Sequence, residues 1–260
     1  MATTNPGSRR ATLRQQQEAE ERARRTKRIM LASIGIGAIL IIAIVAIVAS
    51  QLLNRGGESA GEQLTPPNAS GEHGVYVQAK PPVDGIPHVV VWGDYQCGGC
   101  AANDQLYGPV IDELVTSGDI TAEVRQAHFL DRQAERGPSK RAAMAAAAAD
   151  EVGFFDAYHQ SLYINQQSGY TDQVLRELIP EAIGMSGDDL DRFQDRYDSY
   201  SFEEWVDGAH QLFTDSGVNS TPSYYVGDER LVIYDQETET VQVEPVAEDF
   251  LSAVNELFGS

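Results

Sequence analysis

The sequence predicts a mixed α/β domain that carries a helical insertion and follows one membrane-spanning segment. Three observations support this prediction. A Cys-Gly-Gly-Cys motif at 97–100 separates an apolar, β-branched run from a helical stretch, residues 138–216 show no strand pattern, and residues 29–49 carry no charge. With 260 residues and 42% hydrophobic content, the chain is long and apolar enough for one sizeable folded domain with appendages.

Charge is distributed unevenly along the chain, whose formal net charge is −20. Residues 1–28 contain eight Lys or Arg and three Glu, a net of +5, whereas the remainder contains 11 basic and 36 acidic residues, a net of −25. Contacts with nucleic-acid phosphates require clustered Lys and Arg. The acidic domain is therefore not predicted to bind nucleic acid, and the neighbouring membrane span is sufficient to explain the basic segment.

The N-terminal part of the chain predicts a cytoplasmic segment at 1–28 and a transmembrane helix at 29–53, which would anchor the chain in membrane lipid. The 21 uncharged residues at 29–49 would span a hydrocarbon core of roughly 30 Å at about 1.5 Å per residue. Four basic residues immediately precede this run and only Arg55 closely follows it. The positive-inside rule therefore places the N-terminus in the cytoplasm and the rest of the chain outside. A cleaved signal peptide is the alternative, but its apolar region is typically only about 7–15 residues long.

Residues 54–82 are predicted to form a flexible linker outside the membrane. They are rich in Gly, Pro and Ser and contain few apolar residues. Within this segment, residues 75–77 are a candidate for a first edge strand. The folded domain itself is predicted from 83 to 260.

The two cysteines of the chain, Cys97 and Cys100, are predicted to lie between a strand and a helix. They follow the apolar run at 88–92, which is typical of a buried strand, and they precede a predicted helix at 101–117. At such a junction the first sulfur lies at a helix N-terminus, where unpaired N–H groups and the helix dipole favour a thiolate. Residues 120–129 alternate as a second strand does, so the cysteines are predicted to lie in a βαβ unit with parallel strands.

The remaining elements are predicted from helical periodicity and turn signals. Within the insertion at 138–216, helices are expected at 140–152, 154–164, 171–183, 186–197 and 202–214. A loop then leads into a strand near 223–227, followed by a hairpin of 230–234 with 240–243 and a terminal helix at 245–257. Because its apolar faces need a partner surface, the insertion should pack over the α/β core beside the cysteines.

This order of elements, together with two local motifs, resembles the thioredoxin fold in its DsbA-like form. The motifs are Asp94-Tyr95-Gln96-Cys97-Gly98-Gly99-Cys100 and Gly217-Val218-Asn219-Ser220-Thr221-Pro222-Ser223-Tyr224. The resemblance covers roughly residues 85–258. It implies a thiol–disulfide oxidoreductase in which Cys97 attacks and Cys100 resolves, through a mixed disulfide with the substrate.

The resemblance also implies a substrate-binding surface around the cysteines. The Thr221–Pro222 peptide bond is expected to be cis and to lie against the Cys-x-x-Cys motif, so that the backbone of Thr221 faces an extended substrate. Gly98 and Gly99 are the other expected substrate-binding residues. At these two positions the chain departs from the family's oxidases, which often carry a His or Pro between the cysteines, so no imidazole is available there to stabilise the thiolate.

Two other interpretations of the cysteines stay open, half of a zinc site and a purely structural disulfide. Zinc would need two more ligands from the five histidines, none of which shows the usual paired spacing: His73, His88, His128, His159 and His210. We therefore predict neither a metal nor a cofactor. Asp94, near the end of the first predicted strand, is a candidate for tuning proton transfer at Cys100.

Together these features predict a membrane-anchored, extracytoplasmic thiol–disulfide oxidoreductase. Its expected activity is to oxidise cysteines in exported proteins, because disulfides form and persist outside the cytosol, and a membrane redox partner would reoxidise the cysteine pair. The same pair could instead act as a reductase or isomerase. A non-catalytic substrate-binding module that uses this fold is the alternative from another class.

Overall fold

The computed structural model describes residues 62–132, 134–235 and 237–259. The predicted cytoplasmic segment at 1–28, the predicted transmembrane helix at 29–53 and residues 54–61 of the predicted linker lie outside these ranges. Within the described ranges, no helix is both long and apolar enough to cross a membrane.

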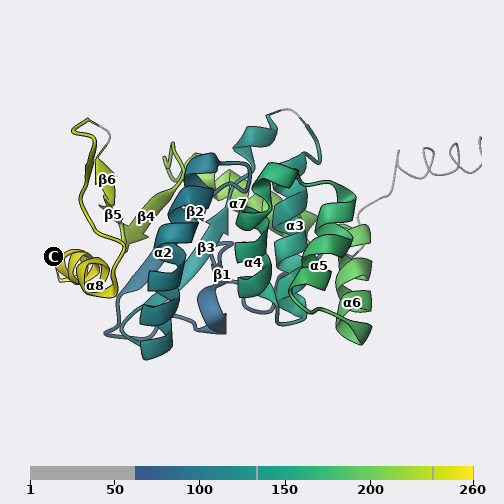
Figure 1. Ribbon diagram of the computed structural model, residues 1–260, viewed down its shortest axis with the longest axis horizontal. Coiled ribbons are helices and arrows are strands. Elements are labelled where there is room, and N and C mark those ends of the chain that lie inside the picture. Colours follow the sequence, from purple (N-terminus) through teal and green to yellow (C-terminus); the bar gives the residue numbers. More distant parts are fainter. Residues whose placement is uncertain (1–61, 133, 236, 260) are drawn as a thin grey trace, which may run out of the picture. The chain divides into compact units, whose positions relative to one another are not determined.

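Five strands form one mixed sheet in the order β1-β3-β2-β4-β5 (Figure 1). Their bounds are β1 (Val75–Tyr76), β2 (His88–Gly93), β3 (Thr121–Gln126), β4 (Ser223–Val226) and β5 (Glu229–Leu231). β2 and β3 are parallel, with Val89 opposite Ala122, and the other three pairs of strands in this sheet are antiparallel. The parallel pair confirms the predicted βαβ unit, because α2 (Gly98–Ser117) connects these two strands.

The predicted insertion at 138–216 is confirmed as helical. It contains α3 (Pro138–Glu151), α4 (Phe155–Ile164), a π-helical turn (Val174–Leu178) that continues into α5 (Ile179–Ala182), α6 (Gly187–Asp198) and α7 (Glu203–Asp215), and α8 (Ala247–Phe258) follows near the C-terminus. In Figure 1, α3 to α6 gather beyond the β1 edge of the sheet, whereas β5 and α8 lie at the opposite end. The alanines of α3 are buried because this helix contacts α4, α6 and α7.

Different helices cover the two faces of the sheet. Side chains alternate along β2, so that Val89 belongs to the larger core, which also includes residues of α2 and α8. Val90 and Trp92 point the other way and form a second core with Phe213 of α7. Because both faces of β2 are covered, its sequence is a continuous apolar run instead of an alternating one.

Residues 62–82, which the sequence predicts to be part of a flexible linker, instead pack on the domain. The backbone N–H of Leu64 donates to the carbonyl of Ser201 at 2.7 Å. Asn68 donates to both carboxylate oxygens of Asp150, at 2.8 and 3.0 Å. These partners lie far along the chain, so a polar composition did not reveal that this segment is held. The packed domain therefore begins before residue 83, and β1 confirms the predicted edge strand at 75–76.

Two predicted strands end differently from the sequence expectation. β3 stops at Gln126 instead of 129, because the chain enters a 3-10 helix at Phe129–Asp131, in which the backbone N–H of Leu130 donates to the Asp94 carboxylate at 3.1 Å. The predicted hairpin of 230–234 with 240–243 is split. Its first strand pairs mainly with the free edge of β4 as β5, and only β6 (Tyr234–Asp235) pairs with β7 (Thr240–Val241).

Candidate active site

Cys97 is the N-cap residue of α2, at the edge of the sheet where β2 ends. The backbone N–H of Cys100 donates to the Cys97 sulfur at 3.2 Å, so the thiol takes the place that a capping hydroxyl or carboxylate usually has. Both thiols are free. Cys97 is partly exposed, whereas Cys100, one turn into the helix, is only 3% exposed. The pair therefore presents one sulfur to solvent and keeps the other inside.

The Thr221–Pro222 loop lies against the cysteines, although it is far from them in sequence. The peptide bond between these two residues is cis, as the resemblance implied. The Cys97 thiol lies 3.5 Å from the carbonyl oxygen of Thr221. The hydroxyl oxygen of Thr221 is buried in the same region. The structure thus brings the cysteine motif and the Thr-Pro motif into one site.

The two glycines between the cysteines add no side chains to the surface around the thiols. A Cβ atom added at Gly98 would meet nothing within 4 Å. One added at Gly99 would stand 3.5 Å from the Pro222 ring and 3.7 Å from the Cys97 sulfur, which is ordinary van der Waals contact. Sterics therefore do not require glycine at either position, and the effect of both residues is to leave the approach to Cys97 open.

The electrostatics of the two thiols differ strongly. Hydrogen bonding from the Cys100 thiol lowers the pKa of Cys97 to about 6, against the opposing effect of burial, with further help from the Thr221 hydroxyl and backbone N–H groups. The same hydrogen bond, burial and the charge on Cys97 raise the pKa of Cys100. Near neutral pH, Cys97 is consequently the thiol of the pair that ionises more readily, and Cys100 stays a thiol.

Asp94 anchors the loop that carries Cys97. Its carboxylate is fully buried and accepts hydrogen bonds from the Gln96 backbone at 2.9 Å, the Leu130 backbone at 3.1 Å and the Ser139 hydroxyl. Burial raises the pKa of this carboxyl group, although each of these bonds opposes the shift. The sequence suggested Asp94 for proton transfer at Cys100, but three donors already occupy its side chain.

Two side chains of the helical insertion hold the backbone around Cys97, and the sequence did not reveal either contact. The side-chain amide of Gln166 donates to the carbonyl of Tyr95 at 2.7 Å and to that of Cys97 at 3.0 Å. The hydroxyl of Tyr170 donates to the same Tyr95 carbonyl at 2.9 Å. These contacts fix the backbone just before the helix. No local pattern in the sequence could have identified them, because they join residues about 70 positions apart.

Only two of the five histidines contact each other. The His128 ring stacks on that of His210, with ring centres 4.1 Å apart. His73 forms a hydrogen bond with the carbonyl of Trp205 and His88 with the hydroxyl of Thr121, whereas His159 lies between Tyr95 and Asp104. Across the part of the chain that the structure describes, no three or more His, Cys, Asp or Glu side chains are grouped so that they could hold a metal ion. The geometry of the cysteines is that of a dithiol at a helix N-terminus.

Comparisons with known proteins agree with this geometry. A family model described as Thioredoxin matches residues 84–243. Among solved structures, the chain is similar to MdbA, a thiol-disulfide oxidoreductase from Corynebacterium diphtheriae (17% identity, TM-score 0.55, covering 66% of this chain and 89% of that one). It is also similar to MdbA from Actinomyces oris (15%, 0.58, 74% and 92%) and to oxidised DsbA from Mycobacterium tuberculosis (20%, 0.52, 72% and 93%). A search of curated proteins found no match.

Proposed function

This chain belongs to the thioredoxin family, and we propose that it is a thiol–disulfide oxidoreductase of the DsbA type. One observation carries the proposal. The partly exposed Cys97 thiol caps α2, has a pKa lowered to about 6 by its hydrogen bond with Cys100, and lies 3.5 Å from the carbonyl oxygen of Thr221. A thiol in this setting is an activated nucleophile and, in the oxidised pair, the sulfur that an incoming thiolate can reach.

Disulfide transfer to a substrate would proceed in two exchanges. A substrate thiolate attacks the Cys97 sulfur of the oxidised pair, the bond between Cys97 and Cys100 breaks, and Cys100 leaves as a thiolate that takes up a proton. A second substrate thiolate then attacks the substrate sulfur of the mixed disulfide, and Cys97 leaves as a thiolate. Because its hydrogen bonds stabilise this thiolate, Cys97 is a good leaving group, which favours the oxidising direction.

The surface beside Cys97 suits an unfolded cysteine-containing protein. The Thr221 backbone lies beside the Cys97 thiol, where an extended segment that passes over the thiol would pair with it. Phe129 and Leu130 are 37% and 39% exposed on the turn that Asp94 holds. Exposed apolar side chains of this kind would contact the apolar residues that an unfolded chain presents.

Two measurements test the direction of exchange: the reduction potential of the Cys97–Cys100 pair and the transfer of its disulfide to a peptide. A pKa of about 6 for Cys97 lies between the values of about 7 for thioredoxin and about 3.5 for DsbA, so we expect a potential between roughly −270 and −120 mV. The oxidised protein should also convert a reduced two-cysteine peptide to its disulfide, followed by mass spectrometry. The matched control is the protein with both cysteines changed to alanine.

A reductase and a non-catalytic binding module would each give other results in these measurements. A potential at or below roughly −270 mV, with fast reduction of peptide disulfides and slow oxidation, would make the protein a reductase. Peptide binding that persists without either thiol, and no exchange in the wild type, would instead favour the binding module.

We further propose that the domain works outside the cytoplasmic membrane on exported proteins, and that a membrane redox partner reoxidises it. The basic cluster before the apolar run at 29–49 supports this orientation. Protease added to intact spheroplasts should digest the domain and spare the N-terminal segment. In permeabilised cells the N-terminal segment should be cleaved as well. A domain that is protected in intact spheroplasts would contradict the proposed topology.

A further inference from the structure

A buried carboxylate, Asp131, ties the loop before Cys97 to the exposed apolar side chains beside it. Asp131 is the last residue of the 3-10 helix Phe129–Asp131, which we call the apolar turn, and it is only 8% exposed. One of its carboxylate oxygens accepts from the side-chain amide of Gln96 at 2.7 Å. Because Gln96 directly precedes Cys97, this bond connects the apolar turn to the cysteine loop at 94–97.

The same carboxylate caps α3. It accepts from the backbone N–H groups of Ser139 and Lys140, both at 2.8 Å. These are the second and third residues of the helix, and its N-cap residue, Gly137, has no side chain to offer them. A Cβ atom at residue 137 would stand 2.2 Å from the carboxyl carbon of Asp131, so glycine is what lets the carboxylate come this close. The first helix of the insertion, the apolar turn and the cysteine loop therefore meet at one side chain.

The tie between the apolar turn and the cysteine loop is reciprocal. The turn donates the backbone N–H of Leu130 to Asp94 of the cysteine loop at 3.1 Å. The cysteine loop in return donates the Gln96 amide to Asp131. Ser139 links the two carboxyl groups, because its hydroxyl donates to Asp94 and its backbone N–H donates to Asp131. Both carboxyl groups are buried, where hydrogen bonds are stronger than at the surface, so the turn is held in a fixed position beside the loop.

We propose that Asp131 is a positioning residue that holds the apolar turn for substrates, an inference that rests on the proposed disulfide exchange. Phe129 and Leu130 are partly exposed on this turn, and the Phe129 ring stacks on Phe213 of α7 with ring centres 5.4 Å apart. A binding surface that is ordered before the substrate arrives costs less to engage than one that must be ordered on binding. With the turn fixed, a substrate segment places an apolar side chain on it while its cysteine meets Cys97. Asp131 thereby favours substrates that carry large apolar residues near the reacting cysteine.

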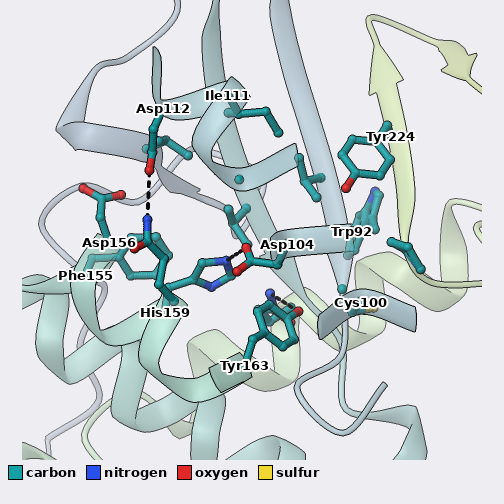
Figure 2. Close-up of a pocket in the computed structure, with 18 residues that line it drawn as sticks. Trp92, Cys100, Asp104, Ile111, Asp112, Phe155, Asp156, His159, Tyr163 and Tyr224 are labelled. Atoms are coloured by element: carbon teal, nitrogen blue, oxygen red, sulfur yellow. Dashed lines mark hydrogen bonds and ion pairs between the residues drawn. The ribbon is translucent and has the colours of Figure 1, made fainter. Parts of the chain in front are cut away.

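The ion pair behind the buried thiol joins different elements. Figure 2 shows the cavity behind Cys100, where Asp104 of α2 lies 3.3 Å from Nε2 of His159 of α4. That contact joins α2 to α4, whereas Asp131 joins the cysteine loop to the apolar turn and to α3. Asp131 does not line this cavity, so a substitution there tests the position of the turn.

The test compares three thiol probes of the oxidised protein: reduced glutathione, a two-cysteine peptide flanked by glycine and serine, and the same peptide flanked by phenylalanine and leucine. Quenching in acid, followed by mass spectrometry, gives the rate at which each probe reduces the protein. In the wild type, the apolar peptide should react about tenfold faster than the polar one, because it gains contact with apolar side chains.

In Asp131→Ala this advantage should be mostly lost. The rate with the apolar peptide should fall about tenfold, the effect expected when a hydrogen bond that orders a binding surface is removed. The rates with glutathione and with the polar peptide should match the wild type. The midpoint for alkylation of Cys97 should stay near pH 6, because the Cys100 thiol, the Thr221 hydroxyl and backbone N–H groups lower its pKa.

Further variants separate positioning of the turn from capping of α3. Gln96→Ala breaks the tie and leaves the cap in place, so it should lose the apolar preference as well, and it decides the question if Asp131→Ala does not fold. Asp150→Ala removes a buried carboxylate near the other end of α3 and should lower the melting temperature without changing the preference. Changing Phe129 and Leu130 to serine removes the apolar contact itself, and adding Asp131→Ala to that variant should change the preference no further.

The outcomes also separate this inference from the proposed function. A wild type that reacts equally well with both peptides, or an Asp131→Ala variant that keeps the apolar preference, would overturn the positioning role while leaving disulfide exchange intact. An equal loss with all three probes would overturn it too, because it would show that Asp131 only supports the fold. A wild-type protein that transfers its disulfide to none of the probes would overturn the proposed function, and this inference with it.

Discussion

The Cys100→Ser variant should accumulate disulfide-linked adducts with cysteine-containing proteins, whereas the Cys97→Ser variant should accumulate none. Cys97 is the partly exposed thiol with a lowered pKa, so we expect it to be the sulfur that meets a substrate. Cys100 is buried and, in the proposed mechanism, releases the substrate, so its loss should leave the mixed disulfide in place. Non-reducing electrophoresis, with mass spectrometry of the adducts, measures the difference, and catalytic exchange should be lost almost completely in both variants.

A variant that lacks both cysteines controls for adducts formed without the pair. The proposed division of labour would be reversed if Cys97→Ser collected adducts and Cys100→Ser did not. Exchange that survives in both single variants would remove the pair from the chemistry and make the binding module the better explanation.

Alkylation of the reduced protein should occur at Cys97 with a midpoint near pH 6. The pKa of Cys97 is lowered to about 6, whereas an ordinary cysteine titrates near pH 8.5, so at pH 6 about half of Cys97 should be thiolate against roughly one part in 300 for a free cysteine. Because only the thiolate reacts, the rate should be full well above pH 6 and should fall as pH drops through it. Iodoacetamide labelling over a pH series, with peptide mass mapping, measures this midpoint.

Two substitutions at Cys100 test what lowers the pKa of Cys97. The hydrogen bond from the Cys100 thiol is the largest cause of the lowered pKa of Cys97. Cys100→Ala removes this donor and should move the midpoint toward alkaline pH, whereas Cys100→Ser keeps a donor and should stay closer to the wild type. A wild-type midpoint near 8.5, the value of a free cysteine, would show that Cys97 is not activated.

Several features of the fold follow from the sequence because their causes are local. The run at 88–92, the cysteine motif and the helix after it are neighbours in the chain, so the N-cap position of Cys97 needed no tertiary information. The parallel pairing of β2 with β3 follows from the crossover connection between them. The helical character of 138–216 follows from its periodicity. The cis Thr221–Pro222 bond and its place beside Cys97 came from the family resemblance, since 124 positions separate the two residues in contact.

The tertiary structure alone determined the contacts between residues that are distant in sequence. Gln166 and Tyr170 fix the backbone before Cys97, and Asp150 holds Asn68 in a segment that looked like a linker. The contact of Asp104 with His159 also belongs here, because α4 lies beside α2 only in the folded chain. Composition and periodicity report which face of an element is apolar, but they do not report which polar group on another element will satisfy a donor or acceptor. The cysteine pair was therefore evident from the sequence alone, whereas the groups that hold it emerged only when the helices packed.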